Sequence, residues 1–142
     1  MTDPVIQRPT RIVVDLNALS HNLQAIRAHV GVPVMGIVKA NAYGHGLVRV
    51  ARHLEAQGVD QLGVAFVEEG VALRKAGIQL PILVLGGIFG PQVAQFLRHD
   101  LEITVSSLDK LRQVEATAEA LGRKAVVHLK IDTGMERIGV HS

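Results

Sequence analysis

A lysine directly behind an apolar run is the residue of this chain best placed to do chemistry. Lys39 follows the run 34–38 and opens the segment Lys39-Ala-Asn-Ala-Tyr-Gly-His-Gly46. Lysine shifts its pKa readily when it loses water, and carbonyl-binding lysines use this property to form Schiff bases. A lysine behind a strand is most often a solvated loop charge, but here a glycine-rich turn follows it. The segment therefore indicates an aldehyde cofactor held as an imine.

A second group of reactive residues accompanies the last apolar run, in Lys130-Ile-Asp-Thr-Gly-Met-Glu-Arg137. The two-residue period of a strand gives one face with Val126, His128, Lys130 and Asp132 and an opposite face with Val127, Leu129 and Ile131. An ammonium buried on the first face is costly unless it is paired, deprotonated or chemically modified. The alternatives are a polar pocket inside a sheet or barrel and an edge strand with a wet face.

Short apolar runs alternate with amphipathic segments, and these elements must position both groups. The predicted strands are 11–16, 34–38, 62–65, 82–85, 101–105 and 125–131. Helical stripes are formed by Leu19, Leu23, Ile26 and Val30, by Leu47, Val50, Ala51 and Leu54, and by Leu108, Leu111, Glu115 and Ala118. Helix-end signals are Gly58, Gly77 and Gly122, first-turn Pro91, and a capping box of Ser106 with Asp109.

Strands that are apolar on both faces, with helical segments between them, predict an α/β fold with a parallel sheet covered by helices. A doubly wound sheet and a TIM-type (β/α)8 barrel both fit. A closed barrel takes about 250 residues, and this chain has 142. In the barrel alternative it therefore supplies roughly the first five strands. Ligands gather at the carboxyl ends of the strands in both folds, which is where Lys39 stands.

The composition argues against several other classes of function. Fifteen Lys and Arg face thirteen Asp and Glu without forming a stripe, and there are three Phe, one Tyr and no Trp, so nucleic-acid binding gains little support. Cysteine is absent and the seven histidines have no metal-ligand spacing. No apolar run approaches the ~20 residues of a membrane span. We expect a cytoplasmic protein without metal, nucleic-acid or membrane partners.

The segment 38–46 resembles the pyridoxal-phosphate lysine signature of the alanine racemase family, and 130–137 resembles that family's second motif. The stretches 8–19, 68–77 and 81–86 extend the resemblance over nearly the whole chain. The first motif is highly specific to racemases of this fold, and the second is moderately so. The resemblance implies an amino-terminal (β/α)8 barrel and a carboxyl-terminal β domain that residues 1–18 contact, in a homodimer with active sites at the subunit interface.

The resemblance also implies the cofactor, pyridoxal 5'-phosphate, and the roles of individual residues. Lys39 would be the aldimine lysine, Tyr43 a hydrogen-bond partner of the cofactor phosphate, and Leu85 a neighbour of the pyridine ring. Arg137 would contact the phenolic oxygen of the cofactor and the substrate carboxylate, while Lys130 would be N-carboxylated and pair with it. Glu136 stands where many family members carry a small or neutral residue, and we expect its side chain to point to solvent.

The implied activity is the interconversion of L-alanine and D-alanine by two-base proton transfer, which supplies D-alanine for peptidoglycan. Lys39 would serve one face, and the second base, a tyrosine, would lie beyond residue 142 with most of the phosphate site. We therefore expect the chain alone to be inactive and poorly soluble. The alternatives are a non-catalytic pyridoxal-phosphate-binding barrel, a racemase of broader amino-acid specificity, and a small nucleotide-binding module that cradles phosphate at residues 44–46.

Overall fold

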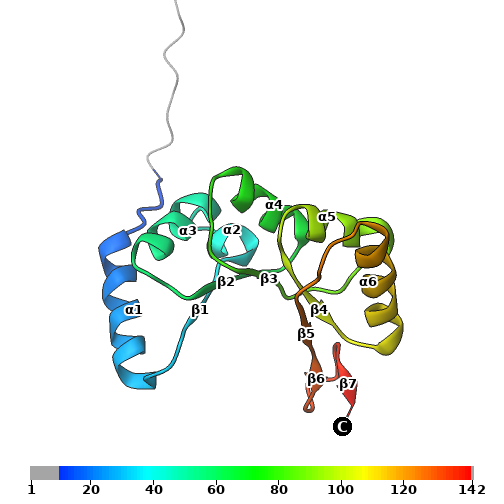
Figure 1. Ribbon diagram of the computed structural model, residues 1–142. Helices are drawn as coiled ribbons and strands as arrows, with labels where there is room; N and C mark the ends of the chain where they lie inside the picture. Colours follow the sequence, from blue (N-terminus) through cyan, green and yellow to red (C-terminus); the bar gives the residue numbers. More distant parts are fainter. Residues whose placement is uncertain (1–9, 142) are drawn as a thin grey trace, which may run out of the picture.

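Five parallel strands form one curved sheet, and helices cover its outer side. The computed structural model describes residues 10–141. The strands follow one another in the sheet as β1 (Met35–Ile37), β2 (Gln61–Val64), β3 (Ile82–Val84), β4 (Glu102–Val105) and β5 (Val127–Leu129). The helices are α1 (Leu16–Val30), α2 (Lys39–Tyr43), α3 (Leu47–Ala56), α4 (Val67–Lys75), the short 3-10 turn η1 (Gly90–Gln92), α5 (Val93–Arg98) and α6 (Leu108–Ala120). Figure 1 shows the helices as an outer arch with the strands along its concave side.

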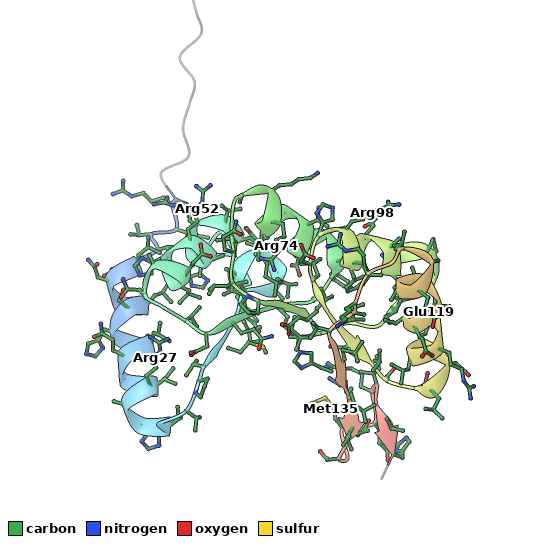
Figure 2. The ribbon with its side chains drawn as sticks, in the orientation of Figure 1. Arg27, Arg52, Arg74, Arg98, Glu119 and Met135 are labelled. Atoms are coloured by element: carbon green, nitrogen blue, oxygen red, sulfur yellow. The ribbon has the colours of Figure 1, made fainter. Side chains whose placement is uncertain are left out.

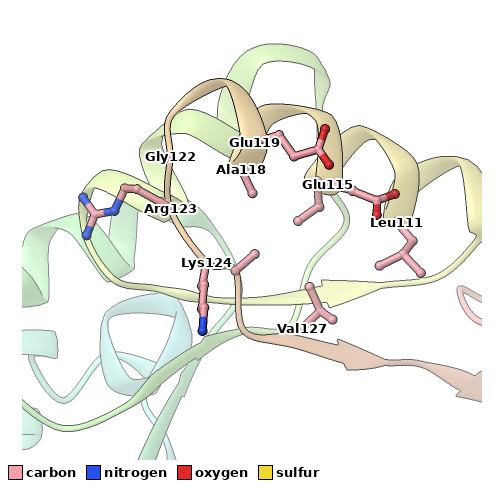
Figure 3. Close-up of a pocket in the computed structure, with 10 residues that line it drawn as sticks. Leu111, Glu115, Ala118, Glu119, Gly122, Arg123, Lys124 and Val127 are labelled. Atoms are coloured by element: carbon pink, nitrogen blue, oxygen red, sulfur yellow. The ribbon is translucent and has the colours of Figure 1, made fainter.

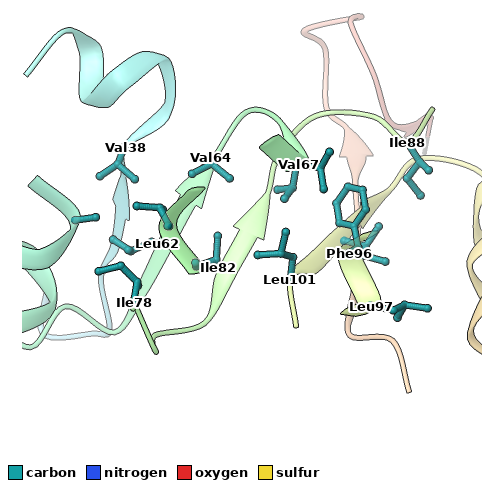
Figure 4. Close-up of a cluster of buried hydrophobic side chains, with 14 of the residues drawn as sticks. Val38, Leu62, Val64, Val67, Ile78, Ile82, Ile88, Phe96, Leu97 and Leu101 are labelled. Atoms are coloured by element: carbon teal, nitrogen blue, oxygen red, sulfur yellow. The ribbon is translucent and has the colours of Figure 1, made fainter. Parts of the chain in front are cut away.

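The main core lies between the sheet and the helices. The strand side chains that face the helices are at most 2% exposed, and they are Leu62, Val64, Ile82, Val84, Ile103 and Val105. Phe96 of α5 and Leu73 of α4 pack into the same cluster, part of which Figure 4 draws. Complete burial of such a side chain contributes about 1.5–3 kcal/mol. This layer therefore fixes which side chains of each strand point the other way.

The concave face of the sheet is more polar than the helix-covered face. The strand register places Leu83 beside Gly63 and Glu102, and His128 beside Thr104. One carboxylate oxygen of Glu102 lies 2.5 Å from the Gln61 amide nitrogen and 2.7 Å from His128 Nε2. The Thr104 hydroxyl donates to the Val84 carbonyl at 2.7 Å. His128 thus occupies the polar inner face that the alternation in the sequence predicts.

The predicted strand 125–131 is interrupted, and this corrects the expectation of one continuous strand. Lys130 is the point of separation, because its N–H donates to the Val105 carbonyl of the main sheet while its C=O accepts from Val140, both at 2.8 Å. The chain then forms β6 (Ile131–Asp132), which pairs with β7 (Val140–His141) in a separate two-stranded sheet. Asp132 consequently leaves the face that His128 occupies.

The predicted strand 11–16 is also wrong within the described residues. Residues 10–15 form no strand there, and Ile12 is 84% exposed, because no described strand pairs with this segment. The Asp15 carboxylate instead accepts from the Asn17 and Ala18 amides at 2.8 and 3.2 Å, so helix α1 begins at Leu16. An N-cap carboxylate satisfies amides that the first helical turn leaves unpaired.

Helix periodicity located the helices better than it located their buried faces. In α3, Val50 and Ala51 are buried, as the stripe predicts. Helix α6 is capped by Ser107 instead of Ser106, since the Ser107 hydroxyl accepts from Lys110. Its buried residues are Val114 and Ala118, while Leu108 is 69% exposed. On α1, Leu23 is buried but Ile26 and Val30 remain about half exposed.

The helix-end signals were largely correct. Gly58, Gly77 and Gly122 adopt φ values of 73°, 90° and 59° just past α3, α4 and α6. Pro91 lies in the first turn of η1.

Charged side chains hold the loops that lead into the amino ends of the strands. The Glu55 carboxylate accepts from the Gln79 and Leu80 amides at 2.8 and 3.2 Å. Asp60 accepts from the Val34 amide at 2.8 Å, and this hydrogen bond is the main reason that the pKa of Asp60 is lowered. These contacts position the scaffold at the edge of the sheet opposite Lys39.

Arg74, in the last turn of α4, makes more hydrogen bonds to these loops than Glu55 or Asp60 does (Figure 2). Its guanidinium donates to four carbonyl oxygens at 2.7 to 3.0 Å, those of Ile78, Leu80, His99 and Asp100. The guanidinium carries five N–H donors in a rigid fork, whereas the compact lysine ammonium has three and cannot satisfy all four acceptors.

We expect Arg74→Met to lower the free energy of unfolding by about 2–3 kcal/mol, because it leaves half-buried carbonyl groups without donors. Arg74→Lys should recover only part of the loss. Urea unfolding followed by circular dichroism measures both variants, with the exposed Arg98→Met as control. Equal stability of Arg74→Met and the control would show that these hydrogen bonds do not hold the loops.

Candidate active site

The backbone behind Lys39 turns with left-handed geometry. Ala40, Asn41, Ala42 and Tyr43 have φ values of 52–56°, and Gly44 follows at 86°. A left-handed conformation costs about 1–2 kcal/mol for each residue that carries a Cβ. Such strain persists only where surrounding contacts impose it, and it gathers at functional sites. The turn at the end of β1 is therefore a candidate functional segment, because its backbone conformation is imposed by surrounding contacts.

The backbone amides of residues 44–46, which could have bound a phosphate, donate hydrogen bonds within the turn instead. Gly44 donates to the Ala40 and Asn41 carbonyls at 3.1 Å, and Gly46 donates to Asn41 at 2.9 Å. His45 donates to Ala42 at 3.0 Å, and Leu47 donates to the Asn41 side chain at 2.8 Å. The alternative of a phosphate cradle at residues 44–46 is disfavoured, because these amides already have acceptors. The nucleotide-binding alternative loses its main support.

The amide at the start of the turn finds its acceptor on another helix. Ala40 donates to Glu69 Oε1 of α4 at 2.7 Å. The second oxygen of Glu69 accepts from Ala65 and Phe66, behind β2, at 2.8 and 3.2 Å. The carboxylate therefore joins the carboxyl ends of two neighbouring strands.

Three of the predicted site residues border one cavity of about 420 Å³ at these strand ends. It is lined by Lys39, Ala65, Phe66, Leu85, Gly86, Gly87, Arg137 and Ile138. A pocket of 300–1,000 Å³ suits a small ligand. Lys39, Leu85 and Arg137 thus border the same cavity although they are far apart in the sequence.

The other predicted residues occupy less direct positions. The Tyr43 ring is 59% exposed, and its centroid lies 6.0 Å from Lys39 Nζ. Lys130 is partly buried but does not line the cavity, and Glu136 is exposed, as expected. An unmodified lysine beside Arg137 would repel it, so pairing of the two requires the chemical change that the resemblance implies.

The loop that carries Arg137 is organised by Asp132. The buried carboxylate accepts from the amides of Gly134, Glu136 and Arg137 at 2.8, 3.1 and 3.2 Å. These backbone hydrogen bonds lower the pKa of Asp132, with the Gly134 amide contributing most. Asp132 therefore fixes the turn that brings Arg137 to the cavity.

Two glycines, Gly86 and Gly87, form part of the cavity wall beside Leu85. A Cβ on Gly86 would collide with the carbonyl oxygen of Ala65, whereas a Cβ on Gly87 would approach only the end of the Ile138 side chain, at 3.4 Å. With the Lys39 amine on the same cavity, these residues fit an aromatic aldehyde cofactor.

A larger hollow, about 640 Å³, lies between α6 and the segment that leads into β5 (Figure 3). Leu111, Val114, Ala118 and Val127 give it apolar walls, and charged side chains such as Glu119 stand at its rim. It contains none of the predicted site residues. We therefore choose the smaller Lys39 cavity as the candidate active site because of the reactive residues that line it.

Comparison with known proteins identifies the family. The profile described as "Alanine racemase, N-terminal domain" matches residues 14–142. The chain belongs to the alanine racemase family. Alanine racemase of Geobacter sulfurreducens is 44% identical over 135 residues, which are 94% of this chain and 35% of that protein. The corresponding protein of Pseudomonas syringae is 46% identical over 94% of this chain and 37% of its own length. The chain thus spans little more than a third of these relatives.

Solved structures settle the fold class. Alanine racemase from Clostridium difficile 630 matches with a TM-score of 0.86 and 42% identity, over 89% of this chain and 34% of that chain. A histidine racemase from Leuconostoc mesenteroides matches with a TM-score of 0.84 and 28% identity, over 89% of this chain and 34% of that one. The five-stranded sheet is therefore part of the alanine racemase (β/α)8 barrel, and the doubly wound alternative is excluded. None of the described helices has the length and apolar character needed to cross a membrane.

Sequence reasoning missed the residues that position the predicted ones. In the sequence, Glu69 is marked only by the 68–77 stretch of the resemblance, and Asp132 only by a strand face and the 130–137 motif. An acidic residue in the first turn of a helix that follows a strand is a usable signal. Phe66 at the capping position hid it, because a capping box normally starts with serine or threonine.

Asp132→Asn tests the Arg137 loop through its pH dependence. A lowered folded-state pKa means that the stabilisation by Asp132 is fully present above the ordinary value of 3.8 and is lost as the pH falls through the lower folded value. We expect the variant to be less stable than the parent at pH 7 and the difference to shrink below about pH 4. Urea unfolding at several pH values measures it, with the exposed Asp109→Asn as control. A difference that stays constant with pH would contradict the assignment.

Gly86→Ala tests the wall of the cavity. The added methyl group meets rigid backbone, so we expect a loss of about 1–3 kcal/mol in the free energy of unfolding. Gly87→Ala adds the same group against a movable side chain and should cost less. Equal unfolding midpoints for the two variants would argue against close packing at Gly86.

Proposed function

We propose that the whole protein is a pyridoxal-phosphate-dependent alanine racemase. The supporting observation is the meeting of Lys39, Leu85 and Arg137 on one cavity at the carboxyl ends of barrel strands, where barrel enzymes place their chemistry. Membership of the family supports the same reaction. Because this chain spans about 35% of a relative, the activity is a property of the whole protein.

The residues of this chain would hold the cofactor in distinct ways. Lys39 would be the covalent attachment point, Leu85 would pack beside the ring, and Tyr43 would donate a hydrogen bond to the phosphate. When bound, pyridoxal phosphate withdraws electrons from the α-carbon of an amino acid and so makes its proton removable. The rest of the catalysis depends on where the protein holds its own amines and guanidinium groups.

Lys39 and Arg137 have complementary tasks in the proposed reaction. The Lys39 amine takes a proton from the α-carbon on one face and returns it to that face in the reverse direction. Arg137 binds the substrate carboxylate, since a guanidinium matches a carboxylate with two parallel hydrogen bonds. An N-carboxylated Lys130 would place an anion against Arg137 and hold its orientation.

Racemisation needs a second proton-transfer group on the opposite face. Tyr43 is the only tyrosine of the chain and is assigned to the phosphate. The second base, which we expect to be a tyrosine, therefore comes from the remainder of the whole protein in a homodimer whose subunits share each active site. The D-alanine formed in the cytoplasm would supply peptidoglycan synthesis.

A broader amino-acid specificity is the one competing function that a particular observation favours. The chain matches a histidine racemase in structure at 28% identity. A panel of amino acids, assayed by chiral chromatography, separates the two proposals. Preference for alanine supports the first, and faster turnover of a larger amino acid supports the second.

Lys39→Ala tests the proposal directly in the whole protein. A general acid–base group typically contributes 10²- to 10⁴-fold in rate, so we expect D-alanine formation to fall by at least about 10²-fold. The exposed Lys75→Ala on the outer helix α4 should retain the parent rate. Borohydride reduction and peptide mapping of the parent should place the cofactor on Lys39.

Either of two results would refute this function. One is a cofactor-loaded parent protein that racemises neither alanine nor any other amino acid. The other is a Lys39→Ala variant as fast as Lys75→Ala.

A further inference from the structure

Glu69 connects the backbone after Lys39 to the backbone after β2 without lining the cavity itself. Its Oε1 accepts from Ala40, the residue after Lys39, at 2.7 Å. Its Oε2 accepts from the Ala65 and Phe66 amides at 2.8 and 3.2 Å. Both of these residues form part of the cavity wall. A single carboxylate thus links the backbone next to Lys39 to the part of the cavity wall that follows the neighbouring strand β2.

We infer that Glu69 is a positioning residue for Lys39, an inference that rests on the proposed function. The left-handed turn supplies acceptors for its later amides, but the Ala40 amide takes its acceptor from Glu69. Without that acceptor the first residue of the strained turn is released towards ordinary backbone geometry. The Lys39 side chain then loses the direction in which it enters the cavity.

Glu69 also has an ordinary structural role, which the test must separate from positioning. It lies in the first turn of α4, where a negative charge stabilises the helix. Two other carboxylates provide matched controls. Glu68 shares the first turn of α4 but contacts only the Gln92 amide, at 3.4 Å. Glu55 of α3 also accepts only from backbone amides, two where Glu69 has three, but these amides lie in the loop before β3 at the opposite edge of the sheet.

The experiment compares Glu69→Gln and Glu69→Ala with Glu68→Gln and Glu55→Gln in the whole protein loaded with pyridoxal phosphate. A displacement of about 1 Å can cost about 10²-fold in rate, so we expect kcat to fall by about 10- to 100-fold in Glu69→Ala with little change in KM for alanine. Glu69→Gln keeps one acceptor oxygen and should lie between Glu69→Ala and the parent. Both control variants should keep the parent kcat, even where Glu55→Gln lowers the unfolding temperature.

Two readouts do not depend on turnover. Hydrogen exchange of the peptide 38–46 should quicken in both Glu69 variants and stay unchanged in both controls. The fraction of Lys39 that borohydride fixes to the cofactor at limiting pyridoxal phosphate should fall in the same order as kcat. These measurements also assess Glu69 if the parent proves not to be a racemase, so the two proposals fail separately.

The inference is overturned if Glu69→Gln, folded and cofactor-loaded, matches Glu55→Gln in kcat and in exchange of the 38–46 peptide. It is also overturned if the activity loss in the Glu69 variants simply follows their loss of thermal stability. Should Glu69→Ala fail to fold, the milder Glu69→Gln carries the decision.

Discussion

The hydrogen bond from the Ala40 amide to the Glu69 carboxylate is the contact on which the candidate site depends. It joins the strained turn behind β1 to the end of β2 and thereby sets where the Lys39 amine enters the cavity. The left-handed turn is unfavourable by itself, so tertiary contacts must supply the free energy that stabilises it. Asp132 does the same for the Arg137 loop with three backbone amides. Glu69 and Asp132 thus organise the backbone around Lys39 and Arg137, the two residues proposed to contact the substrate.

Much of the fold and the central part of the site could be predicted from the sequence. Apolar runs with helical segments between them identified the five parallel strands, because burial on both faces leaves a clear pattern. Strand ends at one edge of such a sheet converge, which explains why Lys39, Leu85 and Arg137 meet although they are distant in sequence. Glycine marked the helix ends reliably, since few other residues adopt positive φ without cost.

The failures share a physical cause, which is that tertiary partners decided the outcome. The sequence predicts a glycine-rich turn behind Lys39, but gives no sign that four non-glycine residues, Ala40 to Tyr43, also adopt positive φ there. Alternation over 125–131 gave no sign that Lys130 divides its N–H and C=O between two sheets. The 11–16 segment has strand-like composition, yet Asp15 caps a helix and no described strand pairs with it. The types of residue in a segment do not show which other segment it will pair with.

Acidic and basic side chains hold loops at both edges of the sheet, but with different duties. At the amino edge, Glu55, Asp60 and Arg74 secure the connections between helix and strand. At the carboxyl edge, Glu69 and Asp132 hold the chain around the cavity. This separation gives a protein engineer two independent handles. Changes at the first edge are expected to alter thermostability with little effect on turnover, and changes at the second to alter substrate preference.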